Sequence, residues 1–303
     1  MIKKIIKGIK NPKLVFLFLL NYKIFRLIPD ALYLKIEYRL RVGKKLNLDV
    51  PKTFNEKIQW LKLYDRKPEY TNLVDKYEVR RHIANTIGEK HLIPLYGVYN
   101  TFDEINFESL PSQFVLKPTH TSGNIYICKD KSKIDFISLR KEINAWLKRE
   151  YYWPNREWPY KNIKPRIICE KYMVDESNIE LKDYKFQCFY GKPELIQVDF
   201  GRFTNHHRNL FDANWNYIDA SILYPNDPNT IIERPICLEK MLELASILAK
   251  SIPHVRVDFY LVKTEIYFGE LTFYHGSGYE PFTPSELELQ MGNWLKLPMR
   301  IDK

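Results

Sequence analysis

The feature of the sequence that most constrains its fold is a pair of apolar segments within residues 255–278, near the C-terminal end. Both segments alternate apolar with other residues, and the polar triplet Lys263-Thr264-Glu265 separates them, a pattern that predicts the two strands of a β-hairpin. Asp258 lies on the first predicted strand and Glu270 on the second. Two carboxylates on neighbouring strands suit Mg²⁺, which proteins usually hold with one or two carboxylates and substrate phosphates. The alternative is an ordinary hairpin whose acidic residues face water.

Another predicted strand, at residues 114–117, ends in a lysine. Lys117 is followed by a hydroxyl-rich loop with one glycine, Gly123, and then by another apolar segment. A lysine beside free backbone N–H groups suits phosphate oxygens. The chain contains no G-x-x-x-x-G-K-[ST] sequence, so this segment is not a Walker loop. A plain hairpin is the alternative here as well.

Basic charge is concentrated at the N-terminal end. Residues 1–50 contain 12 Lys and Arg and three Asp and Glu, whereas the rest of the chain contains 35 and 34. The apolar run at residues 14–20 is far shorter than the roughly 20 residues that span a bilayer, and no small-residue cleavage site follows it. We expect residues 1–45 either to lie on an anionic cytoplasmic membrane surface or to form a helix packed on the body. Nucleic acid is not an expected partner, since no helix-turn-helix or RNP-like motif occurs.

Composition indicates a folded protein from a reducing compartment. The chain has 303 residues, of which 45% are hydrophobic, enough for one large domain or two ordinary ones. Its four cysteines are widely separated and include no C-x-x-C pair, which argues against a cysteine zinc site and favours buried thiols. We therefore expect a cytoplasmic protein, peripheral on the inner face of the plasma membrane if the N-terminal segment contacts lipid.

The order of these segments is more specific than any one of them. Lys76, on a helix predicted over residues 71–87, precedes Lys117 by 41 residues, and a strand ending in Glu170 and a hairpin carrying Lys185 follow. In this order the chain resembles the ATP-grasp superfamily, and more specifically its TupA-like branch, which is linked to teichuronopeptide and other surface-polysaccharide synthesis. The similarity extends from about residue 36 to about residue 298. The segments that carry it are residues 53–62, 74–76, 114–120, 183–186, 196–199, 256–258 and 268–273.

The resemblance implies an α+β ATP-grasp fold, in which two α+β subdomains grip ATP, preceded by a basic helical N-terminal segment. It implies four regions: the basic N-terminal segment at residues 1–50, a helical region before the ATP-grasp fold at 51–110, a lid subdomain at 111–170, and a C-terminal catalytic subdomain at 171–303. Lysines and a flexible lid would bind the phosphates of ATP, and a hinge would hold adenine. The implied nucleotide-binding residues are Lys76, Lys117, Thr119, Ser122, Gly123, Glu170, Lys171, Tyr172 and Met173.

The resemblance also assigns metal, catalytic and acceptor residues. Thr272 departs from the superfamily, which often has Asn at this place, and the lid has fewer glycines than usual. Basic side chains would stabilise the transferred phosphoryl group and the acyl phosphate. The implied metal ligands are Asp258, Glu270 and Thr272; the catalytic residues are Arg256, Lys185 and Arg202; the residues facing the acceptor are His275, Ser277 and Gly278.

The implied function is that of an ATP-dependent carboxylate–amine ligase with ATP and Mg²⁺ as cofactors. Its acceptor would be a uronic acid, or a similar carboxylate, of a surface glycan or its lipid-linked precursor, and its second substrate an amino acid or another amine. A sugar or polyol kinase on the same scaffold and a polysaccharide-biosynthesis glycosyltransferase are the alternatives, although neither a Rossmann-type glycine loop nor a D-x-D triplet supports the latter. A non-catalytic membrane- or glycan-binding module is a further alternative.

Overall fold

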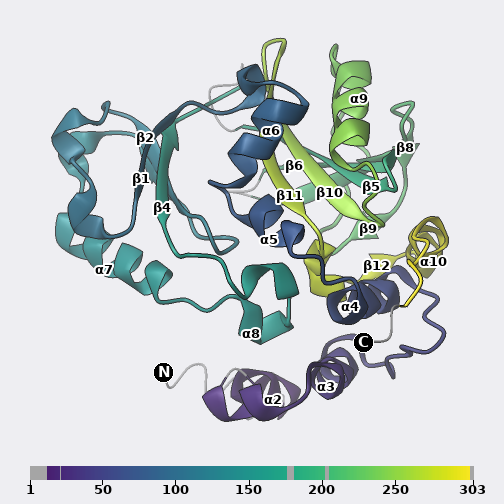
Figure 1. The fold of residues 1–303 in the computed structure, drawn as a ribbon. Helices are drawn as coiled ribbons and strands as arrows, with labels where there is room; N and C mark the ends of the chain where they lie inside the picture. Colours follow the sequence, from purple (N-terminus) through teal and green to yellow (C-terminus); the bar gives the residue numbers. More distant parts are fainter. Residues whose placement is uncertain (1–11, 21, 176–180, 202–204, 301–303) are drawn as a thin grey trace.

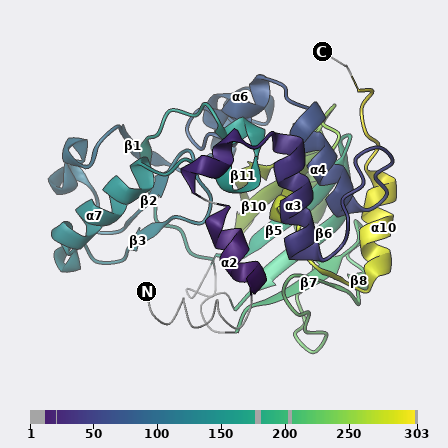
Figure 2. The ribbon, with the colours of Figure 1, turned by 90° about the horizontal axis from the view of Figure 1, so that it is seen from below.

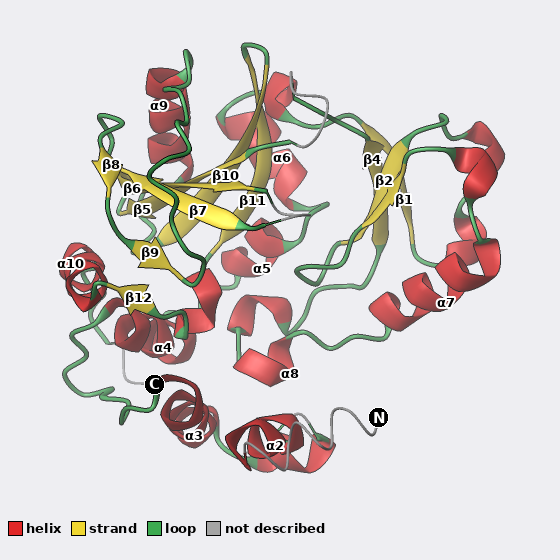
Figure 3. Cartoon of the chain, turned by 180° about the vertical axis from the view of Figure 1, so that it is seen from behind, coloured by secondary structure: helices red, strands yellow, loops and turns green. Residues whose placement is uncertain are grey.

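Two antiparallel sheets, built from segments that are far apart in the sequence, dominate the structure (Figure 1). The computed structural model describes residues 12–20, 22–175, 181–201 and 205–300. Helices and antiparallel strands are mixed without the regular βαβ alternation of a parallel sheet, so the predicted α+β class is confirmed. Seen from behind, the two sheets lie side by side with α5 and α6 between them (Figure 3).

The smaller sheet has the strand order β1-β4-β2-β3. One of its faces is covered by α7 (Phe136–Leu147), whose residues Leu139, Ile143 and Trp146 are buried with the strands in a separate hydrophobic core. The strand at residues 95–99 belongs to this sheet, although the resemblance implied a helical region over residues 51–110. The domain boundaries stay a prediction. Its strands are β1 (Leu95–Tyr99), β2 (Phe114–Pro118), β3 (Tyr126–Cys128) and β4 (Ile167–Lys171).

The larger sheet has the strand order β11-β10-β5-β6-β7-β8. All seven residues of β5 are buried, because α9 (Leu238–Leu248) packs on one face of the sheet and a cluster of polar side chains occupies the other. A separate two-stranded sheet joins β9 (Ser221–Ile222) to β12 (Phe282–Thr283). The strands of the larger sheet are β5 (Asp183–Phe189), β6 (Lys192–Phe200), β7 (His207–Phe211), β8 (Tyr217–Ile218), β10 (Val255–Val262) and β11 (Glu265–Thr272).

The predicted C-terminal hairpin is confirmed and forms one side of this sheet. Strands β10 and β11 pair antiparallel, with Lys263 and Thr264 in the turn between them. Asp258 and Glu270 are direct partners in the register, immediately before an irregularity at Phe259. Since directly opposite residues of an antiparallel pair have neighbouring side chains, the two carboxylates meet on one face of the sheet.

The first helix of the body begins where the sequence predicts. Thr53 and Glu56 form a capping box: the Thr53 hydroxyl accepts from the Glu56 N–H at 3.3 Å, and the Glu56 carboxylate accepts from the Thr53 N–H at 3.1 Å. The helix that follows is α4 (Phe54–Tyr64), which packs against the 3₁₀ turn η7 (His275–Gly278) and against α10 (Ser285–Trp294). It therefore ties an early segment of the chain to the end of the large sheet.

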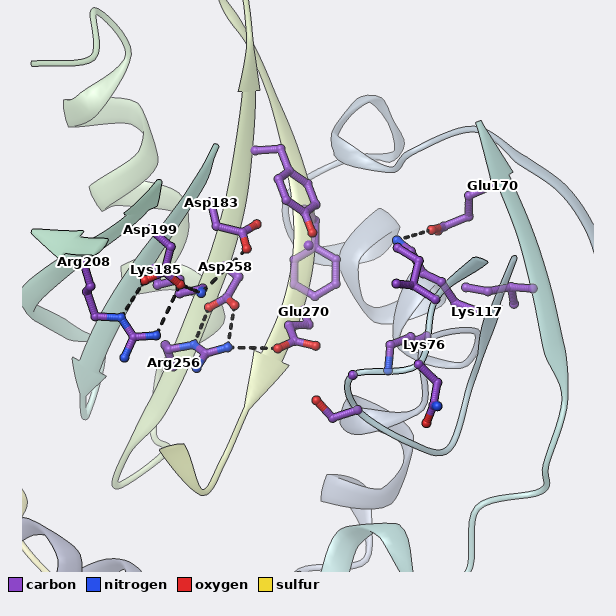
Figure 4. A pocket seen from close by; sticks show the side chains of 18 of the residues that line it. Lys76, Lys117, Glu170, Asp183, Lys185, Asp199, Arg208, Arg256, Asp258 and Glu270 are labelled. Carbon is purple, nitrogen blue, oxygen red and sulfur yellow. Dashed lines mark hydrogen bonds and ion pairs between the residues drawn. The ribbon is translucent and has the colours of Figure 1, made fainter. Parts of the chain in front are cut away.

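The single helix expected over residues 71–87 is wrong. The chain forms α5 (Glu69–Val74) and α6 (Val79–Thr86) instead, because Asp75 has an extended backbone and its carboxylate accepts the N–H groups of Tyr77 and Glu78 at 2.8 and 3.2 Å. The N–H of Lys76 donates to the carbonyl of Thr119, at the end of β2. This break in the helix turns Lys76 towards the space between the two sheets (Figure 4).

The N-terminal helices α2 (Pro12–Leu19) and α3 (Asp30–Val42) lie side by side on one side of the molecule, next to α4 (Figure 2). The 3₁₀ helix η1 (Lys23–Leu27) connects them, and the short α8 (Tyr152–Asn155) lies nearby. Among the described residues, no helix has the length and apolar character that crossing a membrane requires.

Candidate active site

A cavity of about 460 Å³ lies between the two sheets and is lined by polar side chains from both (Figure 4). The large sheet contributes carboxylates and guanidinium groups, and the opposite wall contributes lysines and a glutamate. Lys76 and Glu270 both line this cavity, although they are far apart in the sequence. The charged residues that line it are Lys76, Arg80, Lys117, Glu170, Asp183, Lys185, Asp199, Arg208, Arg256, Asp258, Glu270 and Glu280.

Asp258 and Glu270 share a guanidinium group on the wall formed by β10 and β11. Arg256 donates from Nε and Nη2 to both oxygens of Asp258, at 2.7 and 2.6 Å, and from Nη2 to Glu270 at 2.9 Å. Burial raises the pKa of Asp258 to about 6, against the opposing effect of Arg256. Burial alone would also raise the pKa of Glu270, but Arg256 and Lys76 hold that pKa below its ordinary value. Two carboxylates with one cation leave this wall with an excess of negative charge.

Thr272 acts on Glu270 and does not line the cavity. Its hydroxyl donates to Oε1 of Glu270 at 3.0 Å, so Thr272 contacts another of the expected metal ligands and does not itself face the cavity. The position of Thr272 on β11, two residues after Glu270, explains this contact, because alternate residues of a strand point to the same face.

The opposite wall presents two lysines. The Nζ of Lys76 donates to the backbone carbonyl of Thr121 at 2.5 Å, and the Nζ of Lys117 donates to Glu170 at 2.9 Å. Burial lowers the pKa of Lys76, in opposition to the effect of Glu270. Glu170 also accepts from Arg80 at 3.2 Å, so β2, β4 and α6 are joined at this wall by charged side chains.

A second charged cluster extends the wall of the large sheet. Lys185 forms ion pairs with Asp199 and, at 3.7 Å, with Asp183. Arg208 donates to Asp199 at 2.6 Å. Burial alone would raise the pKa of Asp199, but Arg208 and Lys185 hold it well below its ordinary value. The shared carboxylate therefore fixes two cations side by side on the cavity wall.

The expected nucleotide-binding segments only partly reach the cavity. Ser122 and Gly123 line it, whereas Thr119 is buried outside it and its hydroxyl lies 3.4 Å from the Lys164 carbonyl. Glu170 lines the cavity, but the rest of the expected hinge, Lys171, Tyr172 and Met173, does not. The expected catalytic residue Arg202 falls outside the described residues.

The residues expected to face the acceptor do not line the cavity either. Ser277 and Gly278 pack on α4, where their carbonyls accept from Gln59 at 2.8 and 2.9 Å. His275 is buried behind Arg256, with its Nδ1 3.0 Å from Nη1 of Arg256 and its Nε2 2.9 Å from Glu280. These positions correct the expectation: the turn after β11 leads away from the cavity because η7 is bound to α4. His275 orients Arg256 and Glu280, which do line it.

Five charged residues of the cavity carried no expected role: Arg80, Asp183, Asp199, Arg208 and Glu280. Asp183 and Asp199 begin and end segments that carry the family resemblance, so their positions were a usable signal. Arg80 and Arg208 had no such signal, because they reach the cavity only through the packing of α6 and β7.

The comparison with protein families gives the same result as the resemblance. The family model described as TupA-like ATPgrasp matches residues 56–296. The chain belongs to the TupA-like ATP-grasp family. This membership confirms the predicted ATP-grasp fold. No curated protein matches the sequence.

Solved structures with similarity to this chain are distant. They include D-alanine–D-alanine ligase from Bacillus anthracis (19% identity, TM-score 0.40, covering 66% of this chain and 57% of the other) and from Helicobacter pylori (14%, 0.42, 82% and 70%). A structure of the Bacillus anthracis enzyme complexed with ATP matches with 17% identity, a TM-score of 0.40 and coverage of 66% and 55%. The chain thus spans little more than half the length of the Bacillus anthracis enzyme, and likenesses this weak support no argument about substrates.

Proposed function

We propose that the chain is an ATP-dependent carboxylate–amine ligase whose reaction takes place in the cavity between the two sheets. One observation carries the proposal: Asp258 and Glu270, direct partners on β10 and β11, line the same cavity as Lys76 and Lys117. An acidic wall that can hold a cation and a lysine-bearing wall that can hold phosphates are together what a metal–triphosphate requires.

In this proposal Lys76 and Lys117 bind the phosphates of ATP, under a lid that includes Ser122 and Gly123. The lysines are held close to the cavity by Thr121 and Glu170, at 2.5 and 2.9 Å, so they are oriented before the nucleotide arrives. Adenine would lie at the C-terminal end of β4, with Glu170 to Met173 as the hinge. The boundaries of the lid and catalytic subdomains, at about residues 111, 170 and 171, belong to the same proposal.

Asp258 and Glu270 fit Mg²⁺ by their chemistry. Within the described parts of the chain, no group of three or more His, Cys, Asp or Glu side chains forms a site enclosed by protein ligands. A pair of carboxylates completed by phosphate oxygens is instead the usual arrangement for Mg²⁺. When bound, Mg²⁺ neutralises phosphate charge. Arg256 neutralises one carboxylate without blocking the remaining lone pairs, and Thr272 orients Glu270 through its hydroxyl.

The proposed reaction has two steps. An oxygen of the acceptor carboxylate attacks the γ-phosphorus of ATP, the bond from that phosphorus to the β–γ bridging oxygen breaks, and ADP leaves. The amine nitrogen then attacks the acyl carbon, the bond from carbon to the phosphate oxygen breaks, and an amide, phosphate and the proton of the amine are released. Arg256 and Lys185 would stabilise the negative charge that develops on the transferred group, since fixed cations in a closed site need no reorganisation.

The acceptor we propose is a uronic acid, or a similar carboxylate, of a surface glycan or its lipid-linked precursor, and the amine is an amino acid or a related compound. Lys185 and Arg208, fixed together by Asp199, supply positive charge at the cavity wall for such an anionic acceptor. ATP is available in the cytoplasm, so we place the reaction there.

The test is to measure ADP release and product formation with a panel of uronates and amino acids. We expect ADP release to require both substrates and mass spectrometry to find an amide. A phosphoester product would indicate a kinase instead, and ADP without amide from every pair would contradict the ligase. Glu270→Gln should abolish turnover and the increase in melting temperature caused by Mg-ATP, because a ligand that binds the native state raises it. Glu265→Gln, an exposed residue on the same strand, is the matched control.

A further inference from the structure

The outward side of the N-terminal helices carries large apolar side chains. We call this surface the N-terminal face: the solvent-exposed side chains of α2, η1 and α3 and of the loop after α3. Its apolar members are exposed by 40% to 87% of their surface, far more than the core residues beneath them. Large apolar patches exposed on a protein surface mark interaction sites. The exposed apolar residues are Val15, Phe16, Leu19, Tyr22, Ile24, Leu27 and Leu32.

The solvent-exposed charged side chains of α2, η1 and α3 are basic, whereas the loop after α3 exposes Asp49 as well as lysines. Lys13 and Lys23 are exposed beside the apolar residues of α2 and η1. Lys35 and Arg39 continue the same exposed stripe along α3 at a spacing of four residues, and Lys44 and Lys45 follow in the loop. Lys35, Arg39 and Lys45 form no ion pair with a carboxylate in the described part of the chain.

Both acidic residues between positions 12 and 45 are turned inwards. Asp30 accepts from Arg66 at 2.6 Å and from the hydroxyl of Tyr152 at 2.7 Å. Glu37 is buried and accepts from Arg41 and Tyr279, both at 2.8 Å. The negative charges of this region therefore stabilise its contact with the body, while the surplus positive charges face solvent.

A groove on α3 combines both kinds of side chain. It has a volume of about 540 Å³ and is lined by Lys35, Arg39 and Lys45 together with Ile36, Leu40 and Leu46. The basic side chains can pair with the phosphate of a phospholipid, and the aliphatic side chains can contact its acyl chains. Long basic side chains suit such a boundary because their stems lie along apolar surface while the charge stays in water.

The helices are fixed to the body rather than tethered to it. The guanidinium of Arg26 forms two hydrogen bonds with Glu150, at 2.5 and 3.0 Å, and Arg156 donates to the carbonyl of Phe25 at 3.0 Å. The hydroxyl of Tyr33 donates to the carbonyl of Pro154 at 2.9 Å, so α3 is bound to α8. Figure 2 shows α2 and α3 forming one side of the molecule. A membrane bound to this face would therefore hold the catalytic body in one orientation.

We propose that the N-terminal face binds the surface of a bilayer containing anionic phospholipids. The sequence left open a membrane-bound segment or a helix packed on the body; the inner side of α3 packs on the body, and in this proposal its outer side contacts lipid. Apolar side chains would enter the headgroup region while lysines pair with lipid phosphates, the combination by which interfacial helices bind. The inference does not depend on the proposed reaction.

The test uses the full chain and sedimentation with vesicles of phosphatidylcholine, or of equal amounts of phosphatidylcholine and phosphatidylglycerol, at low and high salt. We expect binding to the anionic vesicles, weakened by salt because exposed charges are screened. In the triple variant Lys35→Gln, Arg39→Gln, Lys45→Gln, the partition coefficient should fall by roughly fivefold for each charge and on the order of 100-fold in all. The double variant Ile24→Ser, Leu27→Ser should also bind more weakly, at either salt concentration.

The control removes three exposed lysines elsewhere, Lys90→Gln, Lys141→Gln and Lys148→Gln, and should bind as the wild type does. Unchanged melting temperatures, and an unchanged response to Mg-ATP, would show that the triple variant is folded. Equal binding to both vesicle types, or an equal loss in the control, would overturn the proposal. So would a wild-type dimer that does not bind vesicles but dissociates in the Ile24→Ser, Leu27→Ser variant, because the face would then be covered by a second copy.

Discussion

Substituting His254 by glutamine tests whether the base of β10 is held in one protonation state. His254 is 1% exposed and lies between Phe54 and Phe189, with ring centroids 4.9 and 5.1 Å away. Its Nε2 is 2.9 Å from Oε1 of Gln187. Burial, with the electrostatic effects of the neighbouring His275 and Arg256, lowers the pKa of His254 to about 3.

The direction of the pH effect follows from that shift. As the pH falls through about 6.5, the ordinary value for histidine, the unfolded chain binds a proton that the folded chain excludes until about pH 3. The unfolded state is therefore favoured, and the free energy of unfolding falls. At pH 5 the accumulated loss amounts to about 2 kcal/mol, whereas at pH 7 it is only a few tenths. Glutamine does not titrate, so the His254→Gln variant lacks this loss.

The measurement is chemical unfolding of the wild type and His254→Gln at pH 7 and pH 5, followed by tryptophan fluorescence. Comparison at each pH cancels the titration of all groups that the two proteins share. At pH 7 the variant should be less stable, since it loses packing against two aromatic rings. At pH 5 the variant should have recovered about 2 kcal/mol relative to the wild type. A difference that stays the same at both pH values would refute the argument that His254 is neutral in the folded protein.

Three further substitutions test the site and its supports. Lys117→Met should weaken the binding of a non-hydrolysable ATP analogue, measured by calorimetry, by on the order of 10- to 100-fold, because a charged hydrogen bond is lost; unchanged affinity would remove Lys117 from the phosphate site. Gly278→Ala should destabilise the protein by about 2 kcal/mol or more, since φ is +66° and the new Cβ would lie 2.6 Å from Gln59 Nε2; a melting temperature equal to the wild type's would contradict this. Thr53→Ala should cost about 1 kcal/mol by removing the cap of α4, and chemical unfolding with no loss would mean that the capping box contributes little.

The parts of the site that follow from local pattern were predictable. Alternation with a period of two and a polar break predicted β10 and β11, and the pairing of Asp258 with Glu270 then follows from the register. The capping box predicted the beginning of α4 from Thr53 and Glu56 alone. In these cases the residues that determine the structure are neighbours in the sequence or lie within one hairpin.

The expectations that failed depend on residues that are far apart in the sequence. The helix predicted over residues 71–87 breaks at Asp75, and the N–H of Lys76 then bonds to the carbonyl of Thr119, 43 residues later. Ser277 and Gly278 looked like a ligand-binding turn, but Gln59 on α4 binds their carbonyls. Neither partner is visible in the local sequence, because each comes from an element that only the packed structure brings close.

By itself, the sequence determined which chemical groups the chain has, the hairpin that carries Asp258 and Glu270, the beginning of α4, and, through the order of its motifs, the family. The tertiary structure decided which groups share a cavity: it brought Arg80 and Arg208 in and left Thr119 and His275 behind the wall. It also turned the acids of α3 inwards and the basic side chains Lys35 and Arg39 outwards. The physical reason is that side-chain direction within one element follows its period, whereas the partner of a buried charge is chosen by how separate elements pack.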